Sequence, residues 1–367
     1  MRGHIRKRAK DSWTVVVELP RDPVTGKRRQ KWVTVKGTKK DAERKLAELL
    51  VQADRGLLPK ASPKMTLGEF LDYFLDTARG KRENTYYGYA AALQFFGDAI
   101  GRSVKLADID TAVVQAAVNA LSKGHKNSTV QVYFTKFKTA MKHAVDAGFL
   151  AKNPCEGVIL NKPERGEKAV WDDDQANKFI RYCKRVRDKY AVLFVFLLKT
   201  GMRVGEALAL RWSDVDFEAG EVHVTRTVSG RGYNPPKSKN GIRKVQLDAG
   251  TLDMLSKYRI QQNKEKLLHG GGWNPENLVF CRENGERMSY ATIRRVFMRM
   301  VKKAGVPLIT IHGLRHTHAT FLLKHGLPVN LVAERLGDDS KTVMTTYAHV
   351  LPSMQREAVK AIERVYD

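Results

Sequence analysis

The sequence predicts a multidomain chain: a small β-sheet with one helix, then an all-α domain, then a mainly α domain with a small β-sheet. At 367 residues the chain is longer than one typical domain and suits two or three. Hydrophobic residues make up 43% of it, which is enough for compact cores. Strand patterns occur early and late in the chain, whereas the middle shows helical periodicity alone. We therefore expect domains at residues 1–60, 61–165 and 166–367.

The first domain is expected to hold the first sheet. The run Trp13–Leu19 is rich in β-branched residues and predicts a strand with alternating faces. Gln30–Val35 predicts a second strand, and the polar segment Pro20–Arg29 predicts the turn between them. A third, shorter strand fits residues 2–8.

One helix should follow this sheet. Thr38 is a candidate N-cap, and the helix would run to about Ala53. Its predicted apolar face consists of Ala42, Leu46, Leu49 and Leu50. Residues 1–60 carry 17 Lys+Arg against 7 Asp+Glu, so this domain is strongly basic. Either the sheet lies on DNA, or the domain simply has a solvated basic face.

The middle of the chain predicts four helices. Apolar residues recur with helical spacing in 66–78, Glu83–Phe96, Asp110–Leu121 and Ser128–Ala147. Basic side chains on these helices either line a DNA-facing side or only solubilise the domain. A linker is expected at Lys152–Lys168, where proline, glycine and charged residues cluster.

The last domain alternates helices and strands. Asp172 or Asp173 can cap a helix, and Tyr190–Lys199 is apolar nearly all round, which is typical of a buried helix. Two strands, Glu221–Val228 and Ile242–Leu247, would flank a polar hairpin. The remaining expected elements are helices at Thr251–Leu268 and Tyr290–Ala304 and a short strand at Leu278–Cys281.

The charge of the chain indicates its partner. Lysine and arginine outnumber aspartate and glutamate by 65 to 39, a formal net charge of +26. This favours a polyanion, nucleic acid first and an anionic membrane second. A membrane is disfavoured, because the longest apolar run, Tyr190–Leu198, is about half of what a span needs. The basic start MRGHIRKRAK has no apolar region after it, so it is not a secretory signal. Three distant cysteines favour a reducing cytoplasm over disulfides or a zinc cluster.

Two groups of residues are candidates for an anion site. Arg203 stands at the start of a helix, next to the buried one, with Glu206 three residues on. Either the two form a structural pair, or Glu206 holds Arg203 so that its guanidinium can face a phosphate. His312 and Arg315 are likewise three apart and share a helical face. The histidines around them lack carboxylates or cysteines at ligand spacing, so a metal is disfavoured.

Four motifs occur in order between residues 200 and 350: TGMRVGE, PPKSKNGIRKV, HGLRHTHAT and LGDDSKTVMTTYAHV. Their combination resembles the tyrosine recombinases, in particular phage-type integrases. The resemblance implies an arm-type DNA-binding domain, a helical core-binding domain and a catalytic domain. It also implies the catalytic residues, which would be Arg203, the hairpin lysine Lys237, His312, Arg315 and the nucleophile Tyr347.

Two positions qualify this resemblance. Lys239 competes with Lys237, since the length of the hairpin varies in the family. After Leu336-Gly337 the family usually has histidine or tryptophan, which helps to position the phosphate, but Asp338 stands here. The role of that position is therefore open, as is any substitution for it by His316 or His349.

The implied reaction cuts and rejoins DNA through a 3′-phosphotyrosine and integrates or excises a mobile element. The covalent intermediate keeps the energy of the phosphodiester, so neither a cofactor nor a metal is expected. The expected partners are double-stranded attachment sites, a homotetramer on DNA and an accessory DNA-bending protein, in the cytoplasm of a bacterial host. The apolar face of a helix at 352–366 would pack either on a neighbouring protomer, as the resemblance implies, or within its own chain. The alternative is a DNA-binding regulator that uses the same scaffold without catalysis.

Overall fold

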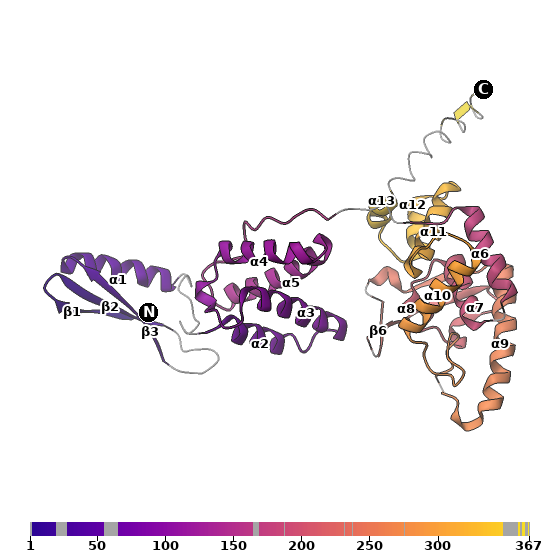
Figure 1. Cartoon of the computed structure of the whole chain (residues 1–367), viewed down its shortest axis with the longest axis horizontal. Coiled ribbons are helices and arrows are strands. Elements are labelled where there is room, and N and C mark those ends of the chain that lie inside the picture. Colours follow the sequence, from indigo (N-terminus) through magenta and orange to yellow (C-terminus); the bar gives the residue numbers. More distant parts are fainter. Residues whose placement is uncertain are drawn as a thin grey trace. The chain divides into compact units, whose positions relative to one another are not determined.

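The computed structural model describes most of the chain: residues 2–19, 28–54, 65–163, 169–186, 188–230, 232–236, 238–274 and 276–347, with the single residues Val359, Ile362, Glu363 and Tyr366. The chain forms two compact units, Met1–Arg165 and Gly166–Asp367. Figure 1 shows a sheet and a helical bundle in the first unit, and a larger, mainly helical body in the second.

The first unit begins with the predicted sheet. Strands β1 (Gly3–Ala9), β2 (Ser12–Leu19) and β3 (Arg29–Lys36) pair antiparallel in the order β1-β2-β3. Helix α1 (Lys39–Asp54) covers one face (Figure 1). The strands and the apolar face of the helix are confirmed, since the shared core contains Val15, Val17, Ala42 and Leu49. Most of the predicted turn at Pro20–Arg29 lies outside the described residues.

The four predicted helices of the middle segment are confirmed. They are α2 (Leu67–Thr77), α3 (Glu83–Ile100), α4 (Thr111–Gly124) and α5 (Asn127–Asp146). Thr66 begins α2 as its N-cap and accepts a hydrogen bond from the Glu69 amide. Large aromatic side chains fill the interior between the helices, among them Phe70, Phe96 and Phe137.

The second unit is built around α7 (Lys189–Thr200). Eight of the twelve residues of this helix are buried and the other four are partly buried, which explains why its sequence is apolar nearly all round. Helices α6 (Asp173–Arg185), α9 (Ala249–His269), α10 (Tyr290–Ala304) and α11 (Ile311–Lys324) pack against it. Asp172 caps α6, as one of the two predicted alternatives.

Three short helices of this unit carry residues of interest. Helix α8 (Val204–Ala207) follows α7 after a break, and α12 (Val329–Leu336) follows α11. Helix α13 (Ser340–Tyr347) comes next and ends at the predicted nucleophile. The side chains of α11, α12 and α13 share a small core of their own, to which Leu323, Val332, Leu336, Val343 and Tyr347 belong.

Two strand predictions were wrong in detail. The expected strand Glu221–Val228 is interrupted: β5 (Glu221–Val224) pairs with β8 (Arg243–Gln246), whereas β6 (Thr227–Ser229) pairs with β7 (Gly232–Asn234). Thr225 and Arg226 between them belong to neither sheet, because the chain changes partner there. A two-residue strand, β4 (Val215–Asp216), also pairs with β5 and had no sequence signal.

The expected strand Leu278–Cys281 is not a strand either. Leu278 and Cys281 form isolated bridges, with Arg211 and Arg287 respectively, and no ladder develops between them. The residues are apolar because they are buried in the core, and not because they belong to a sheet. A short apolar run does not distinguish these two situations.

Surface and thiol chemistry complete this description. All three cysteines are free and buried, and burial raises the pKa of the Cys155 and Cys183 thiols to about 12 and that of Cys281 to about 11.

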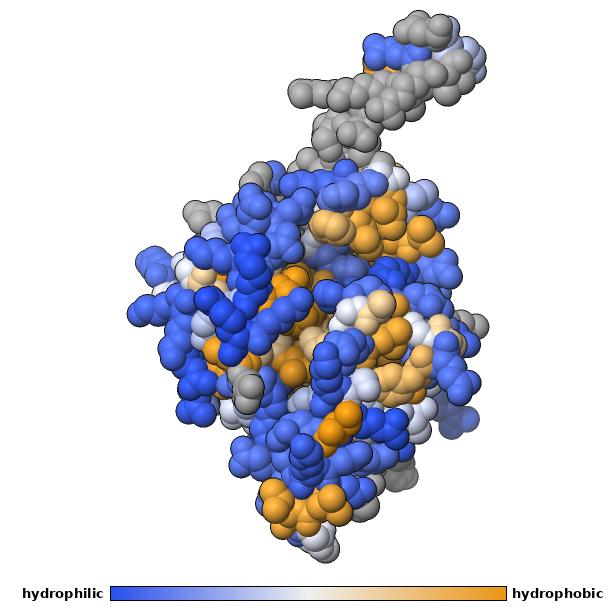
Figure 2. Space-filling view, turned by 90° about the vertical axis from the view of Figure 1, so that its right-hand side faces the viewer, coloured by the Kyte–Doolittle hydropathy of each residue, from blue (hydrophilic) through white to orange (hydrophobic). Residues whose placement is uncertain are grey.

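The face of the second unit in Figure 2 is largely hydrophilic, with hydrophobic side chains gathered in separate patches. Within the described ranges, no helix is long and apolar enough to cross a membrane. Most of the predicted helix 352–366 lies outside the described residues.

Candidate active site

Arg203 is held in place by the helix it begins. It is the N-cap residue of α8, and its backbone amide donates to Glu206 Oε2 at 3.0 Å. Its guanidinium Nη1 donates to Glu206 Oε1 at 2.8 Å. The side chain remains 38% exposed, so the other end of the guanidinium can face a ligand. The structural Arg203–Glu206 pair is therefore confirmed, and the approach of Arg203 to a phosphate stays a prediction.

Glu206 also pairs with a second arginine, which the sequence analysis did not identify. Arg243, at the start of β8, donates from Nη2 to Glu206 Oε2 at 2.9 Å. Burial alone would raise the pKa of Glu206, but Arg243 and Arg203 outweigh it and lower that pKa. Arg243 also donates to the carbonyls of Arg335 (2.8 Å) and Gly241 (3.1 Å), so it joins β8, α8 and the end of α12.

Arg315 approaches the same place from α11. Its side chain is 3% exposed, and Nη1 donates to the carbonyls of Gly201 and Leu336, each at 2.9 Å. Burial lowers the pKa of Arg315, and Arg203 lowers it further, whereas Asp338 opposes the change. Gly201 has φ +67°, and a Cβ there would lie 2.5 Å from His318 Cδ2, so only glycine fits.

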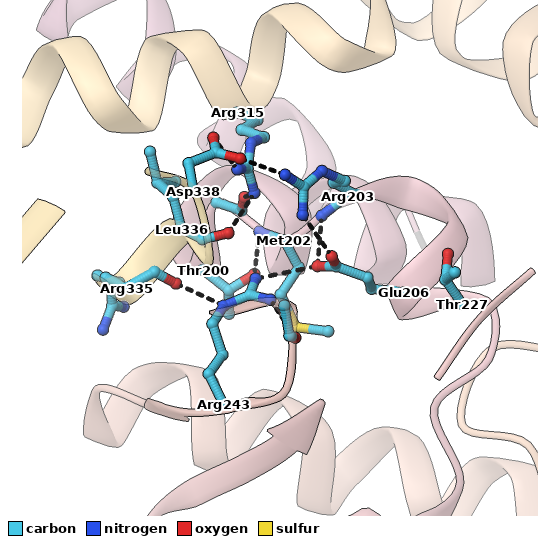
Figure 3. A network of polar contacts seen from close by, with 12 residues as sticks. Thr200, Met202, Arg203, Glu206, Thr227, Arg243, Arg315, Arg335, Leu336 and Asp338 are labelled. Atoms are coloured by element: carbon cyan, nitrogen blue, oxygen red, sulfur yellow. Dashed lines mark hydrogen bonds and ion pairs between the residues drawn. The ribbon is translucent and has the colours of Figure 1, made fainter. Parts of the chain in front are cut away.

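The Asp338 carboxylate lies between the two arginines. One oxygen accepts from Arg203 Nη2, and the other accepts from Arg315 Nη2 at 2.5 Å. Figure 3 shows the carboxylate facing both guanidinium groups, with Glu206 below Arg203 in the view. Two arginines from distant parts of the chain thus converge on one anion.

Tyr347 meets a histidine rather than an arginine. Its hydroxyl lies 2.6 Å from His316 Nδ1, and the side chain is 4% exposed. Burial raises the pKa of Tyr347 to about 12; Arg315 opposes this rise and Asp338 adds to it. His312 is exposed on the first turn of α11, with its ring centroid 4.6 Å from that of His316. The sequence analysis gave His316 no contact with the predicted nucleophile Tyr347, because a 31-residue separation leaves no local signal.

Comparison with known sequences identifies the family of the chain. The profile of the phage integrase family matches residues 169–354, that of the phage integrase SAM-like domain matches 66–161, and that of an arm DNA-binding domain matches 4–53. A "tyrosine recombinase XerC-like" protein of Caldanaerobacter subterraneus subsp. tengcongensis is 31% identical, and the match covers 98% of both chains. The chain belongs to the phage integrase family of tyrosine recombinases.

Solved structures share the fold of this recombinase. The Tn1549 transposon integrase, in complex with transposon right end DNA, has a TM-score of 0.70 at 21% identity, covering 81% of this chain and 99% of that one. A lambda integrase tetramer bound to a Holliday junction has a TM-score of 0.58 at 18% identity, covering 92% and 94%. Among the sequence relatives, the ICEBs1 integrase of Bacillus subtilis is 26% identical over 66% of this chain and 67% of its own.

A buried histidine supports the arginine cluster of the recombinase from behind. His318 Nδ1 lies 3.0 Å from the Leu198 carbonyl, and Nε2 accepts from Arg335 Nε at 3.1 Å. Burial, and secondarily Arg335, lowers the pKa of His318 to about 3, so its ring is neutral. The ring thereby links α11 and α12 to the end of α7. At this end the Gly201 carbonyl accepts the hydrogen bond from Arg315.

The hairpin lysines complete the list of predicted residues. Lys237 lies outside the described residues. Lys239 begins the 3-10 turn Lys239–Gly241, whose last carbonyl binds Arg243 in the cluster. In the part of the recombinase that the structure describes, no group of three or more His, Cys, Asp or Glu side chains could hold a metal ion.

Proposed function

We propose that this recombinase is a site-specific integrase that cuts and rejoins DNA through a 3′-phosphotyrosine at Tyr347. One observation carries the proposal. Arg203 and Arg315 direct their Nη2 atoms at a single anion, and the Tyr347 hydroxyl lies 2.6 Å from Nδ1 of His316, the residue that follows Arg315 on α11. A phosphodiester has the charge and the oxygen geometry that paired guanidinium groups bind best.

In the first step, Tyr347 Oη attacks the phosphorus of the scissile phosphate. A bond forms between Oη and phosphorus, and the bond between phosphorus and the 5′ oxygen breaks. His316 Nδ1, 2.6 Å from Oη, accepts the proton of the hydroxyl, and Lys237 delivers a proton to the 5′ oxygen. Arg203, Arg315 and the exposed His312 donate to the nonbridging oxygens as their charge grows.

In the second step, the 5′ hydroxyl of another strand attacks the phosphotyrosine and restores a phosphodiester. One phosphate ester replaces another in each step, so no external energy source is needed. Exchange between two duplexes requires four active sites, and we infer that four copies assemble on the attachment sites. The lambda integrase tetramer on a Holliday junction, which has the same fold, supports this inference.

The first unit offers a second DNA contact. Its core side chains alternate along the strands, so Arg6, Thr14 and Thr34 lie on the sheet face opposite α1. Arg6 and Arg8 are exposed there, and Trp32 on the same face is 57% exposed. We propose that this face binds arm-type DNA and positions the element that is being integrated or excised.

A covalent trapping assay tests the proposal. A suicide DNA substrate that loses its 5′ hydroxyl strand on cleavage should leave an SDS-resistant adduct with the wild type and none with Tyr347→Phe. Tyr290→Phe is the matched control, because this tyrosine is 54% exposed on α10 and should leave the adduct unchanged. An adduct that persists in Tyr347→Phe contradicts the nucleophile. Binding to attachment-site DNA without any adduct would favour a non-catalytic regulator.

A further inference from the structure

Building on the proposed function, we propose that the Asp338 carboxylate is a built-in competitor of the scissile phosphate, so that DNA can enter the arginine pair only by displacing it. The carboxylate accepts hydrogen bonds from Arg203 Nη2 and Arg315 Nη2 (Figure 3). It lies at the position where the proposed reaction needs a phosphate oxygen. Carboxylates and phosphates are bound by guanidinium groups in the same way.

The remaining contacts of the two arginines explain why both anions need the same atoms. Arg203 Nη1 is engaged by Glu206, and Arg315 Nη1 is engaged by the carbonyls of Gly201 and Leu336. Each arginine therefore presents Nη2 to its ligand. A phosphate bound there would meet the Asp338 carboxylate at hydrogen-bond distance, and two like charges at that distance repel each other.

Burial explains why the free protein benefits from such a competitor. Arg315 is 3% exposed and Arg243 is 5% exposed, and an unpaired buried charge is strongly destabilising. The three arginines Arg203, Arg243 and Arg315 face two carboxylates, Glu206 and Asp338, which leaves a net charge of +1. Removing the charge of Asp338 raises this to +2, which weakens the free fold and strengthens the attraction for phosphate.

The backbone holds Asp338 in place, while its side chain has room to turn. Gly337 has φ +69°, and a Cβ there would lie 2.7 Å from Arg243 Nη1 and 2.8 Å from the Asn240 carbonyl. The Asp338 amide donates to the Ala333 carbonyl at 3.0 Å, so the α12 end fixes the main chain. The side chain lines a polar cavity of about 570 Å³, which Lys244 also lines. A rotation toward this cavity would free both Nη2 atoms without moving the helices.

The first test uses inorganic phosphate as the probe and needs no catalysis. Thermal unfolding of the full chain is measured in phosphate and in chloride of equal ionic strength, for the wild type, Asp338→Asn and Asp339→Asn. Asp339 is the matched control, because it loses the same charge one residue away and its side chain accepts from the Lys341 amide instead. Asp338→Asn should unfold at lower temperature in chloride and recover in phosphate.

From these shifts, Asp338→Asn should bind phosphate roughly tenfold or more tightly than the wild type and the control, since ligand binding stabilises the fold in proportion to ln(1 + [L]/Kd). Equal phosphate responses in all three proteins would overturn the proposal. If Asp338→Asn does not fold, Asp338→His serves in the same assay, because a neutral histidine removes the charge and keeps a nitrogen that can accept a hydrogen bond.

The second test measures single-turnover cleavage of the suicide substrate. Asp338→Asn and Asp338→His should reach half-maximal rate at roughly tenfold lower DNA concentration than the wild type, or cleave faster at saturation. Slower cleavage by a folded variant would overturn the proposal, because the aspartate would then be needed in the reaction. If the phosphate response is as expected but no protein forms an adduct, the competition stands and the proposed recombination fails.

Discussion

The two units place their arginines in opposite environments. On the open face of the first sheet, Arg6 and Arg8 are exposed, and Arg8 makes a long contact of 3.4 Å to Thr34. In the second unit, Arg243 and Arg315 are almost completely buried, and each guanidinium is fixed by several acceptors. Both the sheet face and the arginine cluster are basic, but among the described residues the guanidinium groups are held by several short hydrogen bonds in the cluster and not on the sheet face.

This difference has a physical reason. Exposed arginines attract phosphates through a screened field that does not depend on exact geometry, so mobile side chains are adequate. In the proposed reaction the buried guanidinium groups stabilise a transition state, and such donors must be oriented before the substrate arrives. Carboxylates such as Glu206 provide this order, and without them the buried charges would be too costly.

The largest effect on stability is expected when the carboxylate that fixes the buried arginines is neutralised. Glu206→Gln leaves Arg243 buried without its counter-charge and should destabilise the second unit by about 3–5 kcal/mol. Hydrogen exchange of the α7 amides reports this free energy of unfolding. Glu43→Gln is the contrasting change, because Glu43 pairs with Lys39 at 3.6 Å on the exposed side of α1 and should cost less than about 1 kcal/mol. Equal losses would show that burial does not distinguish the two regions.

A slightly smaller effect, on the rate of cleavage, is expected when the guanidinium geometry of Arg315 is lost but its positive charge is kept. Arg315→Lys keeps the positive charge but cannot bind two carbonyls and an anion at once, so cleavage should fall by about 10²–10³. Single-turnover cleavage at saturating DNA measures the rate, and gel-shift assays should find DNA affinity little changed. The same substitution at Arg299, which is 59% exposed, is the control. A full rate in Arg315→Lys would mean that charge alone is sufficient.

The third prediction concerns pH and the support behind the cluster. The pKa of His318 is about 3 in the folded chain against about 6.5 when unfolded, so below pH 6.5 the unfolded chain binds a proton that the folded chain excludes. Stability from this residue is complete above pH 6.5 and declines as the pH falls toward 3. Between pH 7 and pH 5 the loss should be about 2 kcal/mol.

His318→Gln tests this dependence, because glutamine can still donate to Leu198 and accept from Arg335 without titrating. Its stability, again from hydrogen exchange of α7, should fall less than that of the wild type between the two pH values. Parallel decreases would mean that another group is responsible for the acid sensitivity of this unit.

The smallest expected effect is on the exposed arginines. Arg6→Ala should weaken binding to arm-type DNA a few-fold and reduce the slope of log K against log salt by about 1. Cleavage of a substrate that contains only the scissile site, without arm-type DNA, should stay unchanged. Arg44→Ala removes the same charge from α1, on the covered side of the sheet, and should change neither quantity. If the two variants bind alike, net charge rather than the open face determines the affinity.

Local patterns in the sequence were enough to predict most helices and the first sheet. Period-3.6 stripes and capping residues such as Thr66 and Asp172 depend on neighbours a few positions away. The pairing of Asp338 with Arg203 was not predictable in this way, because 135 residues separate them and either residue alone looks ordinary. Arg243 went unnoticed for the same reason, since its contacts to Glu206 and Arg335 arise only when the chain is folded.

The buried cysteines have a practical consequence. Thiols with pKa values of about 11 to 12 are neither nucleophilic nor accessible at neutral pH, so maleimide dyes should leave Cys155, Cys183 and Cys281 untouched. A single Met344→Cys change, at a side chain that is 53% exposed on α13, would then create one addressable position. A fluorophore attached there could follow in real time how the helix between Asp338 and Tyr347 responds when DNA arrives.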